Sequence, residues 1–105
     1  MASMKERAVL ILGAGTMQLP AIEAASRIGL KSYVVDGNPD APGAELSFRF
    51  EVIDLKDAGG IAEFGRSIPD LAGVFTAGTD FSASVAAVAE ALDLPGISLE
   101  VALDA

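Results

Sequence analysis

The sequence predicts an α/β domain in which two layers of helices cover a parallel sheet of four or five strands. Three observations support this prediction. Strand-like apolar segments alternate with helix-like segments along the chain, the order that builds parallel sheets. The segment Ala8–Leu12 is entirely apolar, as is typical of a strand buried on both faces. It leads into a turn containing Gly13 and Gly15 and then into a helix, an arrangement that can present backbone amides to an anion.

The first elements follow from turn residues and apolar periodicity. Pro20 is acceptable in the first helix because first-turn amides have no intrahelical partner, and Gly29 closes that helix as a left-handed cap. An edge strand is indicated where Phe48, Phe50 and Val52 alternate with charged residues. The strands are expected at Ala8–Leu12, Ser32–Asp36, Phe48–Ile53, Gly73–Thr76 and Gly96–Ser98, and the helices at about Thr16–Ile28, Asp57–Ser67 and Asp80–Leu92.

The two later helices rest on apolar residues at helical spacing. The second helix places Ile61 and Phe64 on one face, although three glycines weaken it. The third helix repeats apolar residues at intervals of three and four along 85–92. Thr79 or Asp80 precedes the third helix and is expected to be its N-cap.

Connection handedness predicts the topology. Right-handed crossovers and the edge character of the third strand favour the strand order 3-2-1-4-5, a Rossmann-like arrangement. The first helix is expected on one face, with the second and third distributed so that both faces are covered. Ligands of such sheets bind beyond the carboxyl ends of the strands where the order reverses, here between strands one and four. The loops Gly13–Gln18, Asp36–Pro39 and Thr76–Ser82 are therefore expected to converge.

Composition restricts the classes of function. A chain of 105 residues is expected to form one domain, and a net charge of −8 argues against binding nucleic acid or an anionic membrane. The sequence has no Cys and no His, which removes disulfides, thiol chemistry and the commonest general base and metal ligand. No catalytic residue and no metal site are therefore expected. Neither a signal peptide nor a run of transmembrane length occurs, so a cytoplasmic location is expected.

The glycine turn departs from the dinucleotide-binding fingerprint at one position. The fingerprint has a third glycine where this chain has Gln18, and close packing of helix on strand beneath a pyrophosphate requires Gly or Ala there. Two interpretations of Gly13 and Gly15 stay open, a tight turn alone or an anion site. Asp36 is equally open. It follows Gly15 by about 20 residues, the spacing of a ribose-binding acid, but Asp36–Pro39 also has the composition of a plain turn.

Several segments, in order and spacing, carry a resemblance to a known family. They are Ile11–Gly15 with Gln18–Ile22, then Val35–Gly43, Gly78–Phe81 and Leu94–Ile97. Together they resemble the Rossmann-like N-terminal domain that precedes the ATP-grasp fold in ATP-grasp ligases. The closest group looks like the carbamoyl-phosphate-synthase-like and biotin-carboxylase-like members. The similarity runs from Ala8 to Ala105, and this family commonly departs from the third fingerprint glycine.

The resemblance implies a function and a division of labour. The full enzyme would use ATP and magnesium to activate a carboxylate as an acyl phosphate, which an amine or another nucleophile attacks. This domain would hold the carboxylate- or phosphate-bearing substrate. The nucleotide clamp and the magnesium ligands would lie in the C-terminal ATP-grasp domain, so this chain alone would bind ATP weakly and hydrolyse none. Carried over by position, the substrate-binding residues would be Gly13, Gly15, Thr16, Met17 and Gln18 on the first loop, Asp36, Gly37 and Asn38 on the second, and Thr79 and Asp80 on the loop after the fourth strand.

The end of the chain suggests a longer protein. Ser98–Ala105 has the pattern of a helix capped by Ser98 that stops after about two turns, and helices that short are marginal in water unless they are packed. We therefore expect residues 1–105 to be the first domain of a longer ligase. The alternatives are an NAD(P)-binding domain of a dehydrogenase, which Gln18 disfavours, and a ligand-sensing module complete at this length. Homodimerisation stays open.

Overall fold

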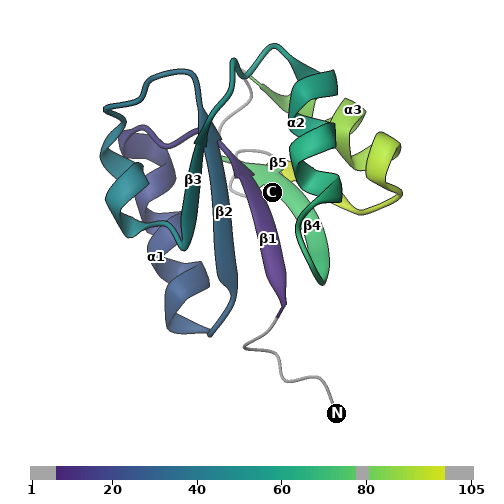
Figure 1. Cartoon of the computed structure of the whole chain (residues 1–105). Coiled ribbons are helices and arrows are strands. Elements are labelled where there is room, and N and C mark those ends of the chain that lie inside the picture. Colours follow the sequence, from purple (N-terminus) through teal and green to yellow (C-terminus); the bar gives the residue numbers. More distant parts are fainter. Residues whose placement is uncertain (1–6, 78–80, 99–105) are drawn as a thin grey trace.

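Five parallel strands form a single sheet in the order β3-β2-β1-β4-β5 (Figure 1). The structure, a computed structural model, describes residues 7–77 and 81–98. Every neighbouring pair of strands is parallel, so the predicted fold class and strand order are confirmed. The strands are β1 (Ala8–Leu12), β2 (Lys31–Asp36), β3 (Arg49–Val52), β4 (Leu71–Thr76) and β5 (Gly96–Ser98).

The predicted first helix is divided into a short 3-10 helix and an α-helix. In the 3-10 helix η2 (Thr16–Gln18) the amide of Gln18 donates to the carbonyl of Gly15, three residues earlier. Pro20 follows at the start of α1 (Leu19–Arg27). Gly29 ends this helical segment with φ of +85°, as predicted. The helices are η2 (Thr16–Gln18), α1 (Leu19–Arg27), η3 (Pro42–Leu46), α2 (Ala58–Arg66) and α3 (Ser82–Leu92).

The third α-helix begins later than expected. Phe81 occupies its N-cap position and makes no side-chain capping hydrogen bond. The expected caps, Thr79 and Asp80, lie outside the described residues. With 11 residues, α3 has about half the length that a membrane span requires. Among the described helices, none is long and apolar enough to cross a bilayer.

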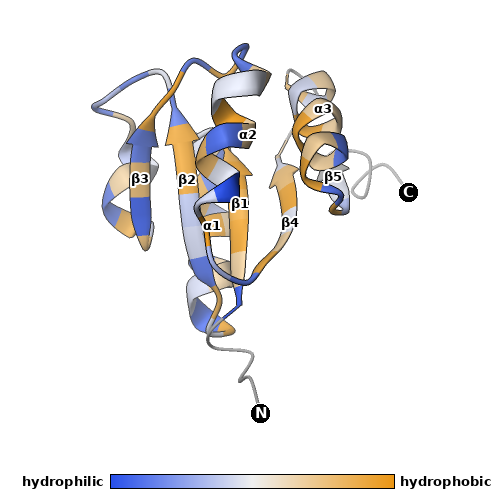
Figure 2. Ribbon diagram, turned by 45° about the vertical axis from the view of Figure 1, so that its right-hand side comes forward, coloured by the Kyte–Doolittle hydropathy of each residue, from blue (hydrophilic) through white to orange (hydrophobic). Residues whose placement is uncertain are grey.

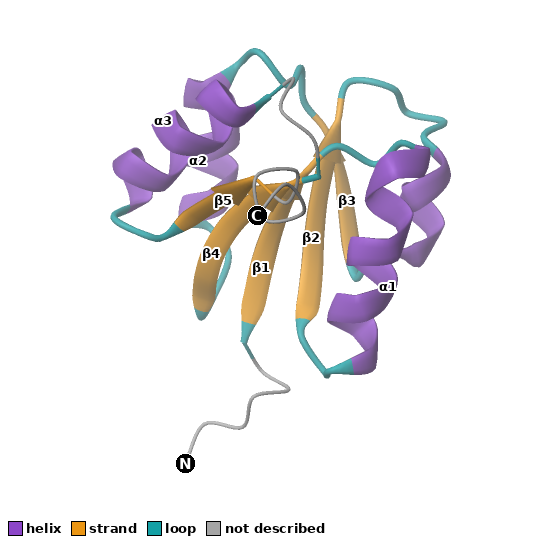
Figure 3. Ribbon diagram, turned by 180° about the vertical axis from the view of Figure 1, so that it is seen from behind, coloured by secondary structure: helices purple, strands orange, loops and turns teal. Residues whose placement is uncertain are grey.

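The helices divide unequally between the two faces of the sheet. Helix α1 lies on one face with η3, whereas α2 and α3 pack against each other on the opposite face (Figure 3). The prediction that the second and third helices would be distributed over both faces is wrong. The chain runs outward from β1 to β3, then crosses back to β4 and continues in the reverse direction to β5. Because each crossover is right-handed, reversing its direction places α2 and α3 together on the other face.

The inner strands supply both halves of the core. Alternate residues of β1 point to opposite faces, with Leu10 and Leu12 in the cluster beneath α2 and α3 and Ile11 in the cluster beneath α1. All three side chains are fully buried. Figure 2 shows the central strands as mostly hydrophobic and β3, at the edge, as mostly polar. The predictions of a doubly buried first strand and of an edge strand are therefore confirmed.

Candidate functional site

The first loop meets the two neighbouring loops at the carboxyl ends of the strands. The amide of Ala14 donates to the Asp36 carboxylate at 2.8 Å, which joins the loops after β1 and β2. The amide of Ala77 donates to Gln18 Oε1 at 2.9 Å, which joins the loop after β1 to the end of β4. The structure thus brings together the first and second predicted loops and the start of the third. Thr79 and Asp80 fall outside the described residues.

Asp36 holds two backbone amides with one carboxylate. Its Oδ1 accepts from the amide of Asn38 at 2.9 Å, an Asx turn of the kind that the local composition predicts. Its Oδ2 accepts from Ala14, as described above. Gly37 and Asn38 are exposed beside it. The plain-turn interpretation accounts for the Asn38 contact, while the Ala14 contact adds a tie that no local pattern indicates.

Gln18 points into the molecule and is only 7% exposed. Its Nε2 donates to the carbonyl of Ala77 at 2.8 Å and to Thr76 Oγ1 at 3.3 Å. The Thr76 hydroxyl in turn donates to the carbonyl of Leu12 at 2.7 Å. Gly13 leaves room for this arrangement. It has φ of +105°, and a Cβ added there would lie 3.2 Å from Gln18 Cγ.

The amides of the first loop fall into an inner and an outer group. In the inner group, Gly13 donates to the carbonyl of Val35 at 2.7 Å and Ala14 donates to Asp36. In the outer group, the amides of residues 15–17 have no acceptor among the described residues. A Cβ added at Gly15 would meet nothing within 4 Å, and Met17 is 69% exposed. The outer group therefore presents adjacent free N–H donors at the start of a helical segment, where the helix dipole also favours an anion.

The Asp36 carboxylate shapes the electrostatics of this turn. It already occupies the Ala14 amide, and its negative charge opposes a second anion at that point. An anion would consequently contact the outer amides of residues 15–17 rather than the whole turn.

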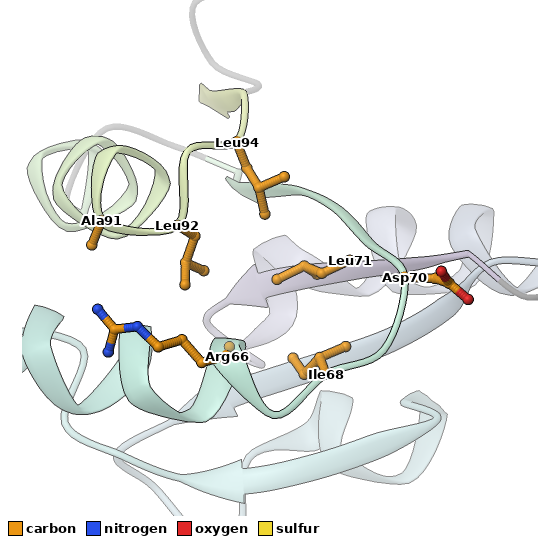
Figure 4. Close-up of a pocket in the computed structure, with 8 residues that line it drawn as sticks. Arg66, Ile68, Asp70, Leu71, Ala91, Leu92 and Leu94 are labelled. Carbon is orange, nitrogen blue, oxygen red and sulfur yellow. The ribbon is translucent and has the colours of Figure 1, made fainter.

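Two pockets lie elsewhere on the surface. A pocket of about 460 Å³ lies between the C-terminal ends of α2 and α3, with Leu71, Leu92 and Leu94 in its lining and Arg66 beside it (Figure 4). Because Leu71 begins β4, this pocket lies at the amino ends of the strands, away from the loops described above. A second pocket of about 380 Å³ borders the second loop and is lined by residues 39–42, 44 and 45. Its charged residues, Asp40 and Glu45, are acidic and do not favour an anion.

Two residues that hold the site were not identified as site residues from the sequence. Thr76 is a buried polar residue at the end of an otherwise apolar strand, a signal that could have singled it out. The amide of Gly43 donates to the carbonyl of Ala14 at 2.6 Å, so η3 supports the glycine turn directly. Gly43 lies in a loop rich in turn residues, and nothing local distinguishes it from the other glycines there.

The part of the chain that the structure describes offers no metal centre. No three acidic side chains come together among these residues, so the magnesium chemistry implied by the resemblance has no ligand set here.

Relatives identified by sequence share part of the chain. Over 64 residues the chain is 41% identical to the formate-dependent phosphoribosylglycinamide formyltransferase of Methanococcus maripaludis strain C5, covering 60% of this chain and 16% of the relative. The enzyme of the same name from Burkholderia vietnamiensis is 44% identical over 50 residues, covering 48% of this chain and 12% of the relative. No protein-family model matches the chain.

Solved structures extend the likeness to almost the whole domain. The crystal structure of phosphoribosylglycinamide synthetase from Anaerococcus prevotii matches with a TM-score of 0.72 and 27% identity, covering 92% of this chain and 25% of that one. These relatives are ATP-grasp enzymes, and the match lies in their N-terminal domain. The chain resembles the N-terminal domain of ATP-grasp ligases. N5-carboxyaminoimidazole synthetase from Staphylococcus aureus, at a TM-score of 0.71 and 15% identity over 86% of this chain and 23% of that one, shares the fold.

The ATP-grasp resemblance inferred from the sequence motifs is thus confirmed. The chain spans between 12% and 25% of the length of these ATP-grasp relatives. The matches give no support to the dehydrogenase alternative.

Proposed function

We propose that this chain is the substrate-binding N-terminal domain of an ATP-dependent ligase and is incomplete as a catalyst on its own. The observation that carries the proposal is the outer group of amides at residues 15–17, which have no acceptor among the described residues and lie where the loops after β1, β2 and β4 meet. The likeness to ATP-grasp enzymes supports the same assignment.

The substrate class is a small molecule that carries a phosphate or a carboxylate. The chain has only seven Lys and Arg residues and a net charge of −8. An anion would therefore be bound mainly by backbone amide donors, assisted by the helix dipole. The sequence relatives are named as enzymes of phosphoribosylglycinamide, which favours a phosphoribosyl compound. The dipole contributes only about 0.3–1 kcal/mol at an exposed site, so we expect millimolar binding by this domain alone.

The remaining chemistry belongs to the rest of the parent protein. There, a C-terminal ATP-grasp domain would supply the nucleotide clamp and the magnesium ligands, and closure of that domain over the substrate would exclude water. When bound, ATP and magnesium would activate the carboxylate for attack by an amine. A cytoplasmic location of the parent protein stays a prediction. A coupled ATPase assay of the 105-residue chain checks the expectation that it hydrolyses no ATP by itself.

An NMR titration of the ¹⁵N-labelled chain with inorganic phosphate tests the proposal. We expect saturable shifts in the amides of Gly15, Thr16 and Met17 at millimolar phosphate. Thr16→Pro removes one donor at the first position of η2, where proline is tolerated. Gly15, with φ of −74° and ψ of −178°, already has the extended backbone that precedes a proline. The substitution should weaken phosphate binding by at least about threefold, since a hydrogen bond to a charged group is lost.

The matched control is Thr16→Ala, which keeps the amide and removes only the hydroxyl. It should bind phosphate nearly as tightly as the unmodified chain does. The proposal fails if phosphate leaves these three amides unmoved. It also fails if NADH binds at micromolar concentration with its pyrophosphate on this turn, because the dehydrogenase alternative would then explain the glycine loop.

A further inference from the structure

The side-chain amide of Gln18 pairs with the backbone of Ala77 as a strand neighbour would. Gln18 Oε1 accepts from the Ala77 amide at 2.9 Å while Nε2 donates to the Ala77 carbonyl at 2.8 Å. The last backbone register pair between β1 and β4 is Ile11 with Phe75. The Gln18 side chain therefore continues the connection between these two segments beyond the end of the sheet ladder.

Thr76 completes a short chain of hydrogen bonds beneath the first loop. Its hydroxyl accepts from Gln18 Nε2 at 3.3 Å and donates to the carbonyl of Leu12 at 2.7 Å. Thr76 is 1% exposed and Gln18 is 7% exposed, so a polar atom left without a partner here would carry a desolvation penalty. No buried side-chain nitrogen or oxygen among the described residues lacks a partner. Both amide protons of Gln18 are thus used within the protein.

This geometry separates two roles on one turn. The amides of residues 15–17 have no acceptor among the described residues, and Thr16 and Met17 are exposed. The side chain of Gln18, on the same 3-10 turn, is instead buried and bonded to Ala77. Because the amide of Gln18 donates to the carbonyl of Gly15 at 2.9 Å, the anchored residue is bonded directly to the segment that presents the free donors. An apolar side chain of similar size would fill the same space but would leave the amide and carbonyl of Ala77 unpaired.

We propose that Gln18 and Thr76 are positioning residues that lock the loop after β1 to the end of β4. An anion bound at the outer amides would then be held in a fixed place relative to Ala77. Its binding would also change the NMR chemical shift of the Ala77 amide. This inference rests on the proposed function, because it names how the proposed substrate loop is held in place. Gln18 itself does not touch the anion.

Two measurements on the ¹⁵N-labelled chain test this inference, with Gln18→Met as the variant. Methionine keeps the length and apolar bulk of the side chain but removes its hydrogen bonds and adds no charge. In the unmodified chain we expect slow hydrogen exchange at Ala77 and a phosphate-induced shift of Ala77 with the same Kd as residues 15–17. In Gln18→Met, exchange at Ala77 should accelerate by at least about tenfold, because its amide loses a part-buried hydrogen bond. Phosphate should bind at least about threefold more weakly, and Ala77 should no longer respond to it.

A second pair of variants covers the case in which Gln18→Met does not fold. Thr76→Val removes the hydroxyl at nearly constant shape and should weaken phosphate binding, whereas Thr76→Ser restores the hydroxyl and should restore binding. Ser84→Ala is the structural control. It removes a comparable hydrogen bond, to the carbonyl of Leu55 at 2.7 Å, far along the chain from the first loop, and should leave the phosphate Kd unchanged.

The possible outcomes separate this inference from the proposed function. If phosphate shifts residues 15–17 equally well in the unmodified chain, Gln18→Met and Thr76→Val, the positioning role is wrong while the proposed function stands. If the hydrogen-exchange rate of the Ala77 amide is unchanged in Gln18→Met, the positioning role is likewise wrong, while the proposed function stands. If phosphate shifts none of residues 15–17 in the unmodified chain, the proposed function fails and the positioning role fails with it.

Discussion

The helices on the two faces of the sheet are held in place by different kinds of contact. Beneath α2 and α3, the core is made of interlocking side chains such as Leu10, Ile61 and Val88, all fully buried. Beneath α1 and η3, backbone approaches backbone, and the amide of Gly43 lies 2.6 Å from the carbonyl oxygen of Ala14. Both faces therefore bury apolar side chains, but the α1 face, whose core cluster includes Ile11, Ile22 and Val34, also fixes the position of the glycine turn.

A pair of glycines makes the contrast measurable. A methyl group added at Gly65, in α2, would lie 2.7 Å from Leu92 Cδ1, the end of a flexible side chain. Leu92 lines the pocket of about 460 Å³ between α2 and α3 (Figure 4), so it has space into which it can move. A methyl group added at Gly43 would lie 2.8 Å from the carbonyl oxygen of Ala14. That backbone atom cannot move without moving the turn, so the same substitution should have unequal effects on the two faces.

The largest effect is expected from Leu10→Ala, on the α2 and α3 face. Leu10 is 0% exposed, and removing a buried leucine typically lowers the free energy of unfolding by about 2–5 kcal/mol. Urea denaturation should show a lower midpoint with an unchanged m-value. A loss below about 1 kcal/mol would mean that this face can repack around the cavity, and the side-chain account of it would be wrong.

A smaller loss, with a functional consequence, is expected from Gly43→Ala. Overpacking at a close contact usually costs about 1–3 kcal/mol, and here the clash also displaces Ala14. Amide resonances of the glycine turn should therefore move. Ile22→Val, which removes the Cδ1 atom lying 2.7 Å from the added methyl, should recover only part of the loss, because the Ala14 oxygen remains. Full recovery in the double variant would show that side-chain crowding, not backbone approach, closes this face.

The smallest effect is expected from Gly65→Ala. Alanine favours a helix interior over glycine by about 1 kcal/mol, and this gain should roughly offset the displacement of Leu92 into the adjacent pocket. The free energy of unfolding should stay within about 1 kcal/mol of the value for the unmodified chain. If Gly65→Ala loses as much as Gly43→Ala, the proposed difference between the two faces disappears.

Much of the site's location could be predicted from the sequence, but its internal contacts could not. The turn at Gly13 and Gly15 and the neighbouring loop at Asp36 follow from local patterns, and strand order brings them to the same edge. The hydrogen-bond partners of Gln18 could not be predicted from local patterns. Its hydrogen-bonded partner Ala77 is 59 positions away in the chain, and a glutamine in a first helical turn can point to solvent equally well by local rules.

The sequence by itself determined the five strands, their parallel arrangement and order, and the three main helical segments, because apolar periodicity and crossover handedness are local or topological properties of the chain. It did not indicate the 3-10 helix η3, which lies in the predicted turn-rich loop, or the division of the first helix into η2 and α1. The placement of α2 and α3 on a common face also follows from that handedness, once the reversal of direction after β3 is taken into account. Only the tertiary structure decided which amides of the glycine turn have no acceptor among residues 7–77 and 81–98. That outcome depends on β2, whose Val35 carbonyl and Asp36 carboxylate accept from the amides of Gly13 and Ala14. Hydrogen bonds between distant segments exist only once packing has brought their atoms within about 3 Å.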